Sequence, residues 1–155
     1  MADFLIVEDD VHKREQLVSF LKSRDENATV KQEVSLIGGI RALRSLKLDC
    51  VVLDMTLPNY DPENDGHIGS VLAFGGVEFL KQARRFKLET PVVVITQFET
   101  FGDDENAKDR KELENDLRQN FPSIFKGMVY YHASLNDWSE ELSFLLDEIL
   151  QENHE

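Results

Sequence analysis

Acidic side chains follow two short apolar runs at separate places in the sequence. Glu8, Asp9 and Asp10 come directly after one run, and Asp54 comes directly after another. Carboxylates held close together repel one another and raise each other's pKa unless a cation lies among them. If the two runs lie side by side, Glu8, Asp9 and Asp54 form a set of oxygen ligands of the kind that Mg²⁺ prefers. The alternative is that each acid only ends a strand or caps a helix, as we expect of Asp10 for the helix that follows it.

The runs that must place these acids are short and rich in β-branched residues. Continuous apolar runs are typical of parallel strands that are buried on both faces. We expect strands at Phe4–Val7, Val51–Leu53, Val92–Ile95 and Met128–Tyr131, with a weaker, alternating strand at Thr29–Val34. Apolar residues at helical spacing predict helices between and after them, at Val11–Arg24, Leu36–Leu46, Val77–Phe86 and about Asp137–Leu150.

Strand and helix thus alternate five times along the chain. Right-handed crossovers between parallel strands put helices on both faces of a sheet. The pattern therefore predicts an α/β fold, a doubly wound three-layer sandwich around a parallel five-stranded sheet in the order 2-1-3-4-5. In that topology the carboxyl ends of the first and third strands flank the point where ligands bind. Glu8, Asp9 and Asp54 lie at those two ends.

Length and charge limit the classes of function. The 155 residues favour one domain, which we expect to span residues 1–152, with a short polar tail at 153–155. The net charge of −13 repels nucleic acids and anionic membrane surfaces, so we expect neither as a partner. No apolar run approaches the ~20 residues of a membrane helix, and the N-terminus has acids where a secretory signal has basic residues, which predicts a soluble, cytoplasmic protein. The single cysteine, Cys50, is expected to be buried.

Two segments are longer than plain connections need to be. Thr56–Gly76 is rich in Gly and turn-forming residues, and loops longer than ~12–15 residues are usually functional or mobile. Within it, Asp61–Ile68 resembles the first half of an EF-hand calcium loop, but Leu72 stands where the bidentate Glu belongs, which favours a chance polar loop. Phe101–Lys126 predicts a long, charged and largely solvated helix, with a sparse apolar side made of Ala107, Leu113 and Leu117.

Three motifs, in this order, resemble the receiver domain of bacterial two-component response regulators. Phe4–Asp10 resembles the first strand of that family with its acidic pair, and Val51–Pro58 resembles the phosphoacceptor strand with the Pro that follows it. Pro91–Thr96 resembles the fourth strand with its switch hydroxyl. One motif alone would be weak, whereas the three in this order are specific. The resemblance spans nearly the whole chain and implies the flavodoxin-like, CheY-like (βα)5 fold.

The resemblance also implies a role for each matching residue. Asp54 would be the nucleophile that takes a phosphoryl group from a histidine kinase, a phosphotransfer protein or a small phosphodonor. Asp9 and Asp54 would bind Mg²⁺ directly, the carbonyl of Thr56 would be the third protein ligand, and Glu8 would hold the metal through water. Thr96 would hydrogen-bond a phosphoryl oxygen. Such a site fits phosphoryl transfer, which depends mostly on positioning and charge neutralisation.

The chain departs from the family after the fifth strand. The family has a Lys there that pairs with the phosphoryl group, whereas this chain has His132, and the nearest upstream lysine, Lys126, precedes the strand. Histidine can donate a hydrogen bond, but it is not a permanent, long-reaching cation at neutral pH. His132 is therefore either a substitute for the Lys or a plain strand-end residue.

Three functions are compatible with parts of this set of residues. The leading one is a stand-alone receiver with no enzymatic activity beyond its own phosphorylation and dephosphorylation, whose output is contact with a downstream protein target. The second is a pseudo-receiver that signals without phosphate; the missing Lys favours it, and the intact acids and Thr96 oppose it. The third, a phosphatase of the haloacid-dehalogenase type, is disfavoured because Thr56 stands where those enzymes need a second Asp.

Overall fold

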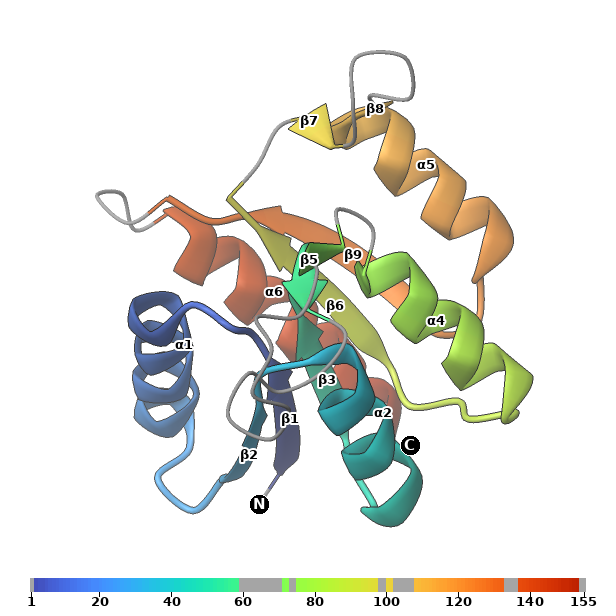
Figure 1. Ribbon diagram of the computed structural model, residues 1–155. Helices are drawn as coiled ribbons and strands as arrows, with labels where there is room; N and C mark the ends of the chain where they lie inside the picture. Colours follow the sequence, from blue (N-terminus) through green and yellow to red (C-terminus); the bar gives the residue numbers. More distant parts are fainter. Residues whose placement is uncertain are drawn as a thin grey trace, which may run out of the picture.

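A parallel sheet of five long strands forms the middle layer of the computed structural model (Figure 1). The structure describes residues 2–58, 71–72, 75–97, 100–101, 108–132 and 137–153. The long strands are β1 (Asp3–Val7), β2 (Thr29–Glu33), β3 (Cys50–Leu53), β6 (Val92–Thr96) and β9 (Phe125–Tyr130). They lie in the order β2-β1-β3-β6-β9. Because β6 and β9 are the fourth and fifth long strands along the chain, the expected order 2-1-3-4-5 is confirmed.

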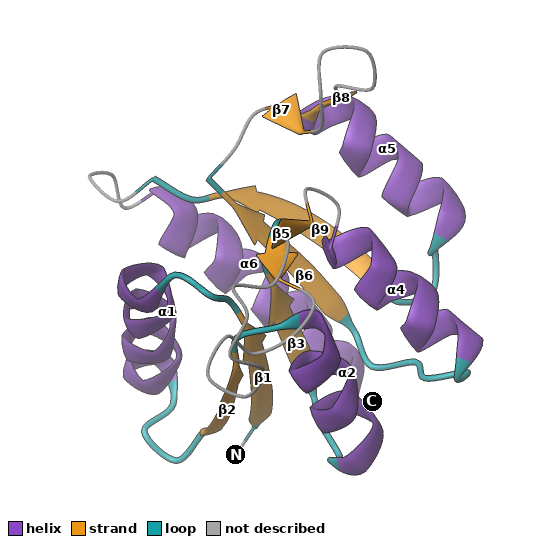
Figure 2. Ribbon diagram, viewed as in Figure 1, coloured by secondary structure: helices purple, strands orange, loops and turns teal. Residues whose placement is uncertain are grey.

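Helices cover both faces of this sheet (Figure 2). They are α1 (Val11–Arg24), α2 (Leu36–Ser45), α4 (Gly75–Arg85), α5 (Arg110–Asn120) and α6 (Asp137–Asn153). α1 and α6 pack on one face, and α2, α4 and α5 pack on the other. The doubly wound three-layer sandwich is therefore confirmed, although α6 extends three residues past its expected end at Leu150. No helix in the described part of the chain has the length and apolar character to cross a membrane.

The central strands are buried on both faces because helices lie on each side of them. Every residue of β3 has an exposed fraction of 0%. Side chains alternate along the strands, so Leu5 and Val51 lie in the core under α2, α4 and α5, whereas Ile6 and Cys50 lie in the core under α1 and α6. Cys50 is buried, as expected, and burial raises the pKa of its thiol to about 12. The thiol therefore stays protonated and unreactive at neutral pH.

The charged segment after β6 is not the long helix that its composition predicts. Two short strands, β7 (Thr100–Phe101) and β8 (Lys108–Asp109), pair antiparallel before the helix begins. The helix starts only at Arg110, because Asp109 is its N-cap and accepts the backbone N–H of Glu112 at 2.8 Å. A capping carboxylate satisfies one of the free N–H groups of a helix end, so Asp109 is a strong start signal. The expected helix over Phe101–Lys126 was wrong at both ends.

The apolar side of that helix is nevertheless placed as its spacing predicts. Leu113 and Leu117 are buried against the sheet, and they lie four residues apart on one face of α5. Ala107, the third residue expected on this side, lies outside the described residues. Phe121 is the C-cap of the helix, and its backbone N–H donates to the carbonyl of Leu117 at 2.8 Å. The Phe121 side chain is buried. The charged side chains of α5 therefore form the outer surface of a helix that is anchored by a few apolar residues.

The chain just after Asp54 is held by tight packing. The backbone N–H of Gly76, near the start of α4, donates to the carbonyl of Met55 at 2.8 Å. A Cβ on Gly76 would lie 3.0 Å from the Cα of Met55 and 3.1 Å from the carbonyl oxygen of Asp54. A larger residue at this position would push the helix and the backbone apart by a few tenths of an ångström. The packing of α4 against Met55 thus holds the backbone next to Asp54 in place.

The long insertion after Asp54 is joined at its base. β4 (Leu57–Pro58) pairs antiparallel with β5 (Val71–Leu72), so both ends of the insertion lie side by side. The segment that resembles half of an EF-hand loop, Asp61–Ile68, lies outside the described residues. The first and last residues of the insertion therefore lie beside each other, and its first residues follow Asp54 closely in the sequence.

Candidate functional site

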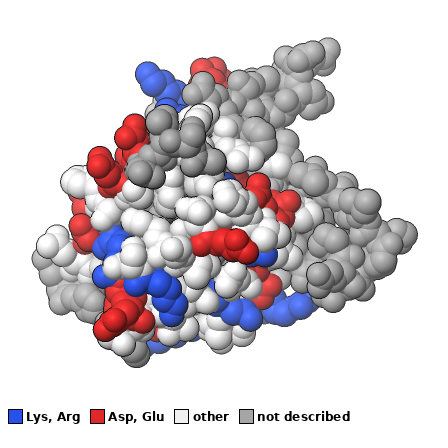
Figure 3. Space-filling model, turned by 90° about the vertical axis from the view of Figure 1, so that its left-hand side faces the viewer, with Lys and Arg blue, Asp and Glu red and all other residues white. Residues whose placement is uncertain are grey.

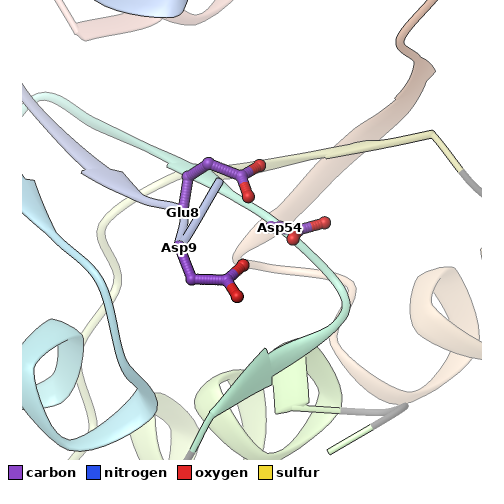
Figure 4. Close-up of side chains that lie close together, drawn as sticks. All are labelled: Glu8, Asp9 and Asp54. Carbon is purple, nitrogen blue, oxygen red and sulfur yellow. The ribbon is translucent and has the colours of Figure 1, made fainter. Parts of the chain in front are cut away.

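Three carboxylates come together at the carboxyl edge of the sheet. Val7 of β1 pairs with Leu53 of β3, so the residues that follow them leave neighbouring strand ends. One carboxylate oxygen from each of Glu8, Asp9 and Asp54 lies within 4.8 Å of the other two (Figure 4). Glu8 and Asp54 are 1% and 5% exposed, whereas Asp9 is open to solvent. The convergence expected from the topology is therefore present, and the roles of the three acids stay predictions.

A lysine that no sequence motif marks lies inside this cluster. Lys13, in the first turn of α1, is 2% exposed. Its Nζ lies 2.6 Å from Oε1 of Glu8 and 3.2 Å from Oδ1 of Asp54. It also donates a hydrogen bond to the carbonyl of Ile95 at 2.8 Å, and it lies 5.7 Å from the ring centre of Tyr131. One ammonium group thus contacts residues at the ends of β1, β3 and β6.

The start of α1 explains why this lysine points inward. Asp10 is the N-cap, as expected, and its carboxylate accepts the backbone N–H of Lys13 at 3.1 Å. Side chains of a helix tilt toward its N-terminus, so Lys13 leans back over the strand ends. It also precedes Leu17 by four residues and Leu21 by eight, and both leucines are buried. Residues four apart share a helix face, so this spacing was the signal in the sequence that placed Lys13 on the buried side.

The charges at the site shift each other's pKa values. Burial raises the pKa of Glu8 to about 8, although the ammonium of Lys13 lowers it. Burial and the charge of Asp54 raise the pKa of Asp9. Burial lowers the pKa of Lys13, but Asp54 and then Glu8 raise it more, so that it lies above the ordinary value. Lys13 therefore stays charged, and Glu8 holds a proton near neutral pH unless a second cation enters the site.

The residues present fit a hard divalent cation. Oε1 of Glu8 is buried and lies 2.6 Å from the ammonium of Lys13 as an ion pair, and it accepts no hydrogen bond in the described part of the chain. A buried carboxylate oxygen that accepts no hydrogen bond can take a bound cation as a further partner. When ionised, three carboxylates and one ammonium carry two net negative charges, which is the charge that one Mg²⁺ neutralises. Carboxylate oxygens are also the ligands that Mg²⁺ prefers.

Binding of Mg²⁺ is expected to strengthen as the pH rises toward 8. Glu8 must release its proton to a cation, and its pKa of about 8 means that binding below this pH frees protons. By the same linkage, the stability of the metal-free protein falls between about pH 4.5 and 8, because folded Glu8 still binds a proton that the unfolded chain, with a pKa of 4.5, has lost. Calorimetric titration with MgCl₂ in buffers of different ionisation enthalpy measures both affinity and proton release. Glu8→Gln should abolish the release of protons on Mg²⁺ binding. A parent protein whose Mg²⁺ affinity does not change with pH would contradict the expected role of Glu8.

The two threonines of the predicted site lie at the same edge of the sheet. Thr96 is the last residue of β6 and is fully buried, and it directly follows Ile95, whose carbonyl accepts from Lys13. β6 neighbours β3 in the sheet, so Thr96 ends the strand next to the one that Asp54 follows. Thr56 is half-buried, directly after the Met55 that Gly76 holds. Their proposed contacts with phosphate and metal stay predictions.

His132 has a different environment from Lys13. It follows β9 at the same edge of the sheet, its side chain is exposed, and its ring centre lies 6.4 Å from that of Tyr130. Lys126 lies in β9 near its beginning, far along the strand from His132. The lysine that contacts Asp54 therefore comes from the helix after the first strand. Whether His132 substitutes for the family's Lys stays a prediction.

Comparisons with known proteins agree with this fold. Residues 4–111 match a family model described as the response regulator receiver domain. An uncharacterized protein of Sinorhizobium fredii, y4jR, is 36% identical over 135 residues, which cover 86% of this chain and 89% of that protein. The Detocs response regulatory protein DtcB of Enterobacter cloacae is 29% identical over 140 residues, covering 89% of this chain and 93% of that protein. In fold, the crystal structure of a CheY-like response regulator receiver domain protein from Methanospirillum hungatei aligns over 98% of both chains, with a TM-score of 0.64 at 17% identity.

Proposed function

The chain belongs to the response regulator receiver domain family, a family of two-component signalling domains, and on that basis we propose that it is a phosphoacceptor whose output is protein contact. Asp54 accepts a phosphoryl group from a histidine kinase or a phosphotransfer protein. The modified domain then binds a downstream protein target. The likeness to the Detocs response regulatory protein of Enterobacter cloacae supports a regulatory role of this kind.

The surroundings of Asp54 are the observation that carries the proposal. This carboxylate is 5% exposed, it has two further carboxylates within 4.8 Å, and Oδ1 lies 3.2 Å from a buried ammonium. Phosphoryl transfer needs a positioned nucleophile and positive charge around the phosphoryl oxygens. Asp54 is positioned by the end of β3 and by the packing of α4. The three carboxylates would bind a metal ion, and the ammonium of Lys13 supplies a second positive charge beside Asp54.

Each neighbouring residue then has a part in the reaction. Asp9, Asp54 and the carbonyl of Thr56 would hold Mg²⁺, and Glu8 would hold it through water. When bound, the ion neutralises charge on the phosphoryl oxygens. The hydroxyl of Thr96 would donate to one of those oxygens.

The transfer step itself exchanges one bond for another. A carboxylate oxygen of Asp54 forms a bond to phosphorus while the bond from phosphorus to its leaving group breaks. From acetyl phosphate the leaving group is acetate, which keeps the electron pair as an anion. From a phosphohistidine it is the imidazole nitrogen, which takes a proton from solvent. The product in both cases is an acyl phosphate on Asp54.

Incubation with acetyl phosphate and MgCl₂ is expected to add the mass of one phosphoryl group, and Asp54→Asn is expected to abolish the gain. An amide has no anionic oxygen to attack phosphorus. Intact-mass spectrometry measures the adduct, which base or hydroxylamine should remove because it is an acyl phosphate. The matched control is Asp49→Asn, which changes the same residue type at the opposite end of β3, where the Asp49 carboxylate accepts the backbone N–H of Asp3 at 2.8 Å. This control should keep the mass gain.

Two results would overturn the proposal in different ways. A mass gain that persists in Asp54→Asn would move the phosphoacceptor to another residue. A parent protein that gains no mass, from acetyl phosphate or from a purified phosphorylated histidine kinase, would instead favour the pseudo-receiver.

A further inference from the structure

We propose that Lys13 supplies the phosphoryl-binding cation that the receiver family places after its fifth strand, and that in this chain the cation enters the pocket from α1. The inference rests on the proposed function, because it assumes that Asp54 carries the phosphoryl group. It assigns to Lys13 a role for which His132 was the candidate by position.

The contacts place the ammonium where the phosphoryl group must form. Nζ of Lys13 already lies 3.2 Å from Oδ1 of Asp54, as both an ion pair and a hydrogen bond. Its hydrogen bond to Ile95 holds it one residue before Thr96, the other proposed phosphate contact. The ammonium from α1 is thus held at the end of β6, the strand whose last residue is Thr96. Two donors at one strand end can serve the same phosphoryl group.

The burial of Lys13 is difficult to explain by stability. On the face drawn in Figure 3, Lys and Arg side chains lie at the surface among acidic ones, as solvated charges do. Lys13 is 2% exposed, and it lies in the first turn of a helix, where the dipole disfavours a positive charge. Buried ion pairs often contribute less to stability than well-packed apolar residues of the same size. Apolar residues in place of Lys13, Glu8 and Asp54 together would avoid the desolvation of these charges, so the buried group of three indicates a function.

The chemistry needs no proton transfer by Lys13. Its ammonium has three N–H donors. It donates hydrogen bonds to Oδ1 of Asp54 and to the carbonyl of Ile95, and it forms an ion pair with Glu8. When the acyl phosphate forms, a donor that faces Asp54 can turn to a phosphoryl oxygen while the bond to Ile95 stays. The site thereby pairs a fixed positive charge with the new negative charge. Lys13 remains an ammonium before and after the transfer.

The effect of removing Lys13 on Mg²⁺ affinity distinguishes a phosphoryl-binding role of this residue from a purely structural role. Lys13 and the metal would share the carboxylates of Glu8 and Asp54, so their like charges repel each other. Removing the ammonium should leave Mg²⁺ affinity unchanged or make it tighter. Removing it should weaken the binding of a phosphoryl group. Damage to the fold would weaken both.

Lys13→Met is expected to bind beryllofluoride, a mimic of the phosphoryl group, about tenfold more weakly than the parent in the presence of MgCl₂, because one charge-assisted hydrogen bond is lost. Titration calorimetry should show no loss of affinity for MgCl₂ alone, and the initial rate of phosphorylation by acetyl phosphate should fall by a similar factor. Lys22→Met is the matched control, since Lys22 lies at the other end of α1 and donates to the carbonyl of Ala28. Adding His132→Lys to Lys13→Met should restore much of the beryllofluoride affinity by returning a lysine to the family's position.

Unaltered protein provides a second measurement that does not depend on the fold of a variant. With ¹⁵N-labelled lysine, the buried ammonium should give an NMR signal that is absent in Lys13→Arg and that shifts when beryllofluoride binds. Unchanged beryllofluoride affinity in Lys13→Met, or an ammonium signal that does not move, overturns the assignment of Lys13 while Asp54 still gains its phosphoryl mass. A parent that neither gains this mass nor binds beryllofluoride overturns the proposed function instead.

Discussion

Addition of Mg²⁺ is expected to stabilise the folded protein by about 2.7 kcal/mol at a free concentration of ~100 times the dissociation constant. We expect the ion to bind only the folded chain, because Asp54 meets Glu8 and Asp9 only where the ends of β1 and β3 lie side by side. The increment is a large part of the usual stability of a domain of this size. Urea unfolding in MgCl₂ and in EDTA, at the same ionic strength, measures it.

The variant that tests this effect most cleanly is Asp9→Asn. Asp9 is exposed, so the substitution removes a proposed ligand and leaves the core intact. It should reduce the Mg²⁺ increment strongly and change the stability in EDTA only slightly. Asp49→Asn should keep the full increment. If urea midpoints in MgCl₂ and EDTA coincide for the parent protein, the proposed metal site is wrong.

Lys13→Met is expected to lower the free energy of unfolding of the metal-free protein by about 3–5 kcal/mol at a pH above 8. Above that pH the ammonium of Lys13 stabilises an ionised Glu8 in the parent protein. Without the ammonium, the folded variant must either bury two repelling carboxylates, those of Glu8 and Asp54, or take up a proton on Glu8. At lower pH the loss should be smaller, because Glu8 can keep its proton. Saturating Mg²⁺ should recover much of the loss, since the ion supplies positive charge to the same two carboxylates.

Urea unfolding of this variant over a pH series, with and without Mg²⁺, measures these effects. Lys22→Met removes one positive charge from the same helix and should show neither the pH dependence nor the recovery. A loss in Lys13→Met that is equal at all pH values and equal in Mg²⁺ would mean that the side chain acts through packing, for example against Tyr131, and not through its charge.

The fold could be predicted because its signals are local. Continuous apolar strands and apolar helix faces specify the alternation, and the right-handed crossover rule then leaves few topologies. The boundaries of the long strands agree with the apolar runs to within a few residues, as β3 illustrates at Cys50–Leu53. The short pairs β4–β5 and β7–β8 could not be predicted, because two-residue strands depend on contacts between distant segments and carry no periodicity of their own.

The acids of the site could be predicted from their places after strand ends, whereas Lys13 could not. Charged residues are seldom buried unless they are paired, so the burial of Lys13 follows only once its partners in the fold are known. The bounds of α5 differ from the expected helix over Phe101–Lys126 because the charge of this segment does not say where a helix begins, whereas the capping carboxylate of Asp109 does.

The pairing of β4 with β5 makes the segment between them an insertion whose length and sequence can change without changing the sheet. Its two ends are fixed next to each other by Leu57 and Leu72, so the rest of the fold does not depend on how far apart they lie in the sequence. Shortening such a stretch to a third of its length changes the entropy of closing it by only ~1 kcal/mol. Related chains can therefore differ in length here while their acids keep their places. The same junction is a natural position for grafting a reporter peptide that sits a few residues from Asp54.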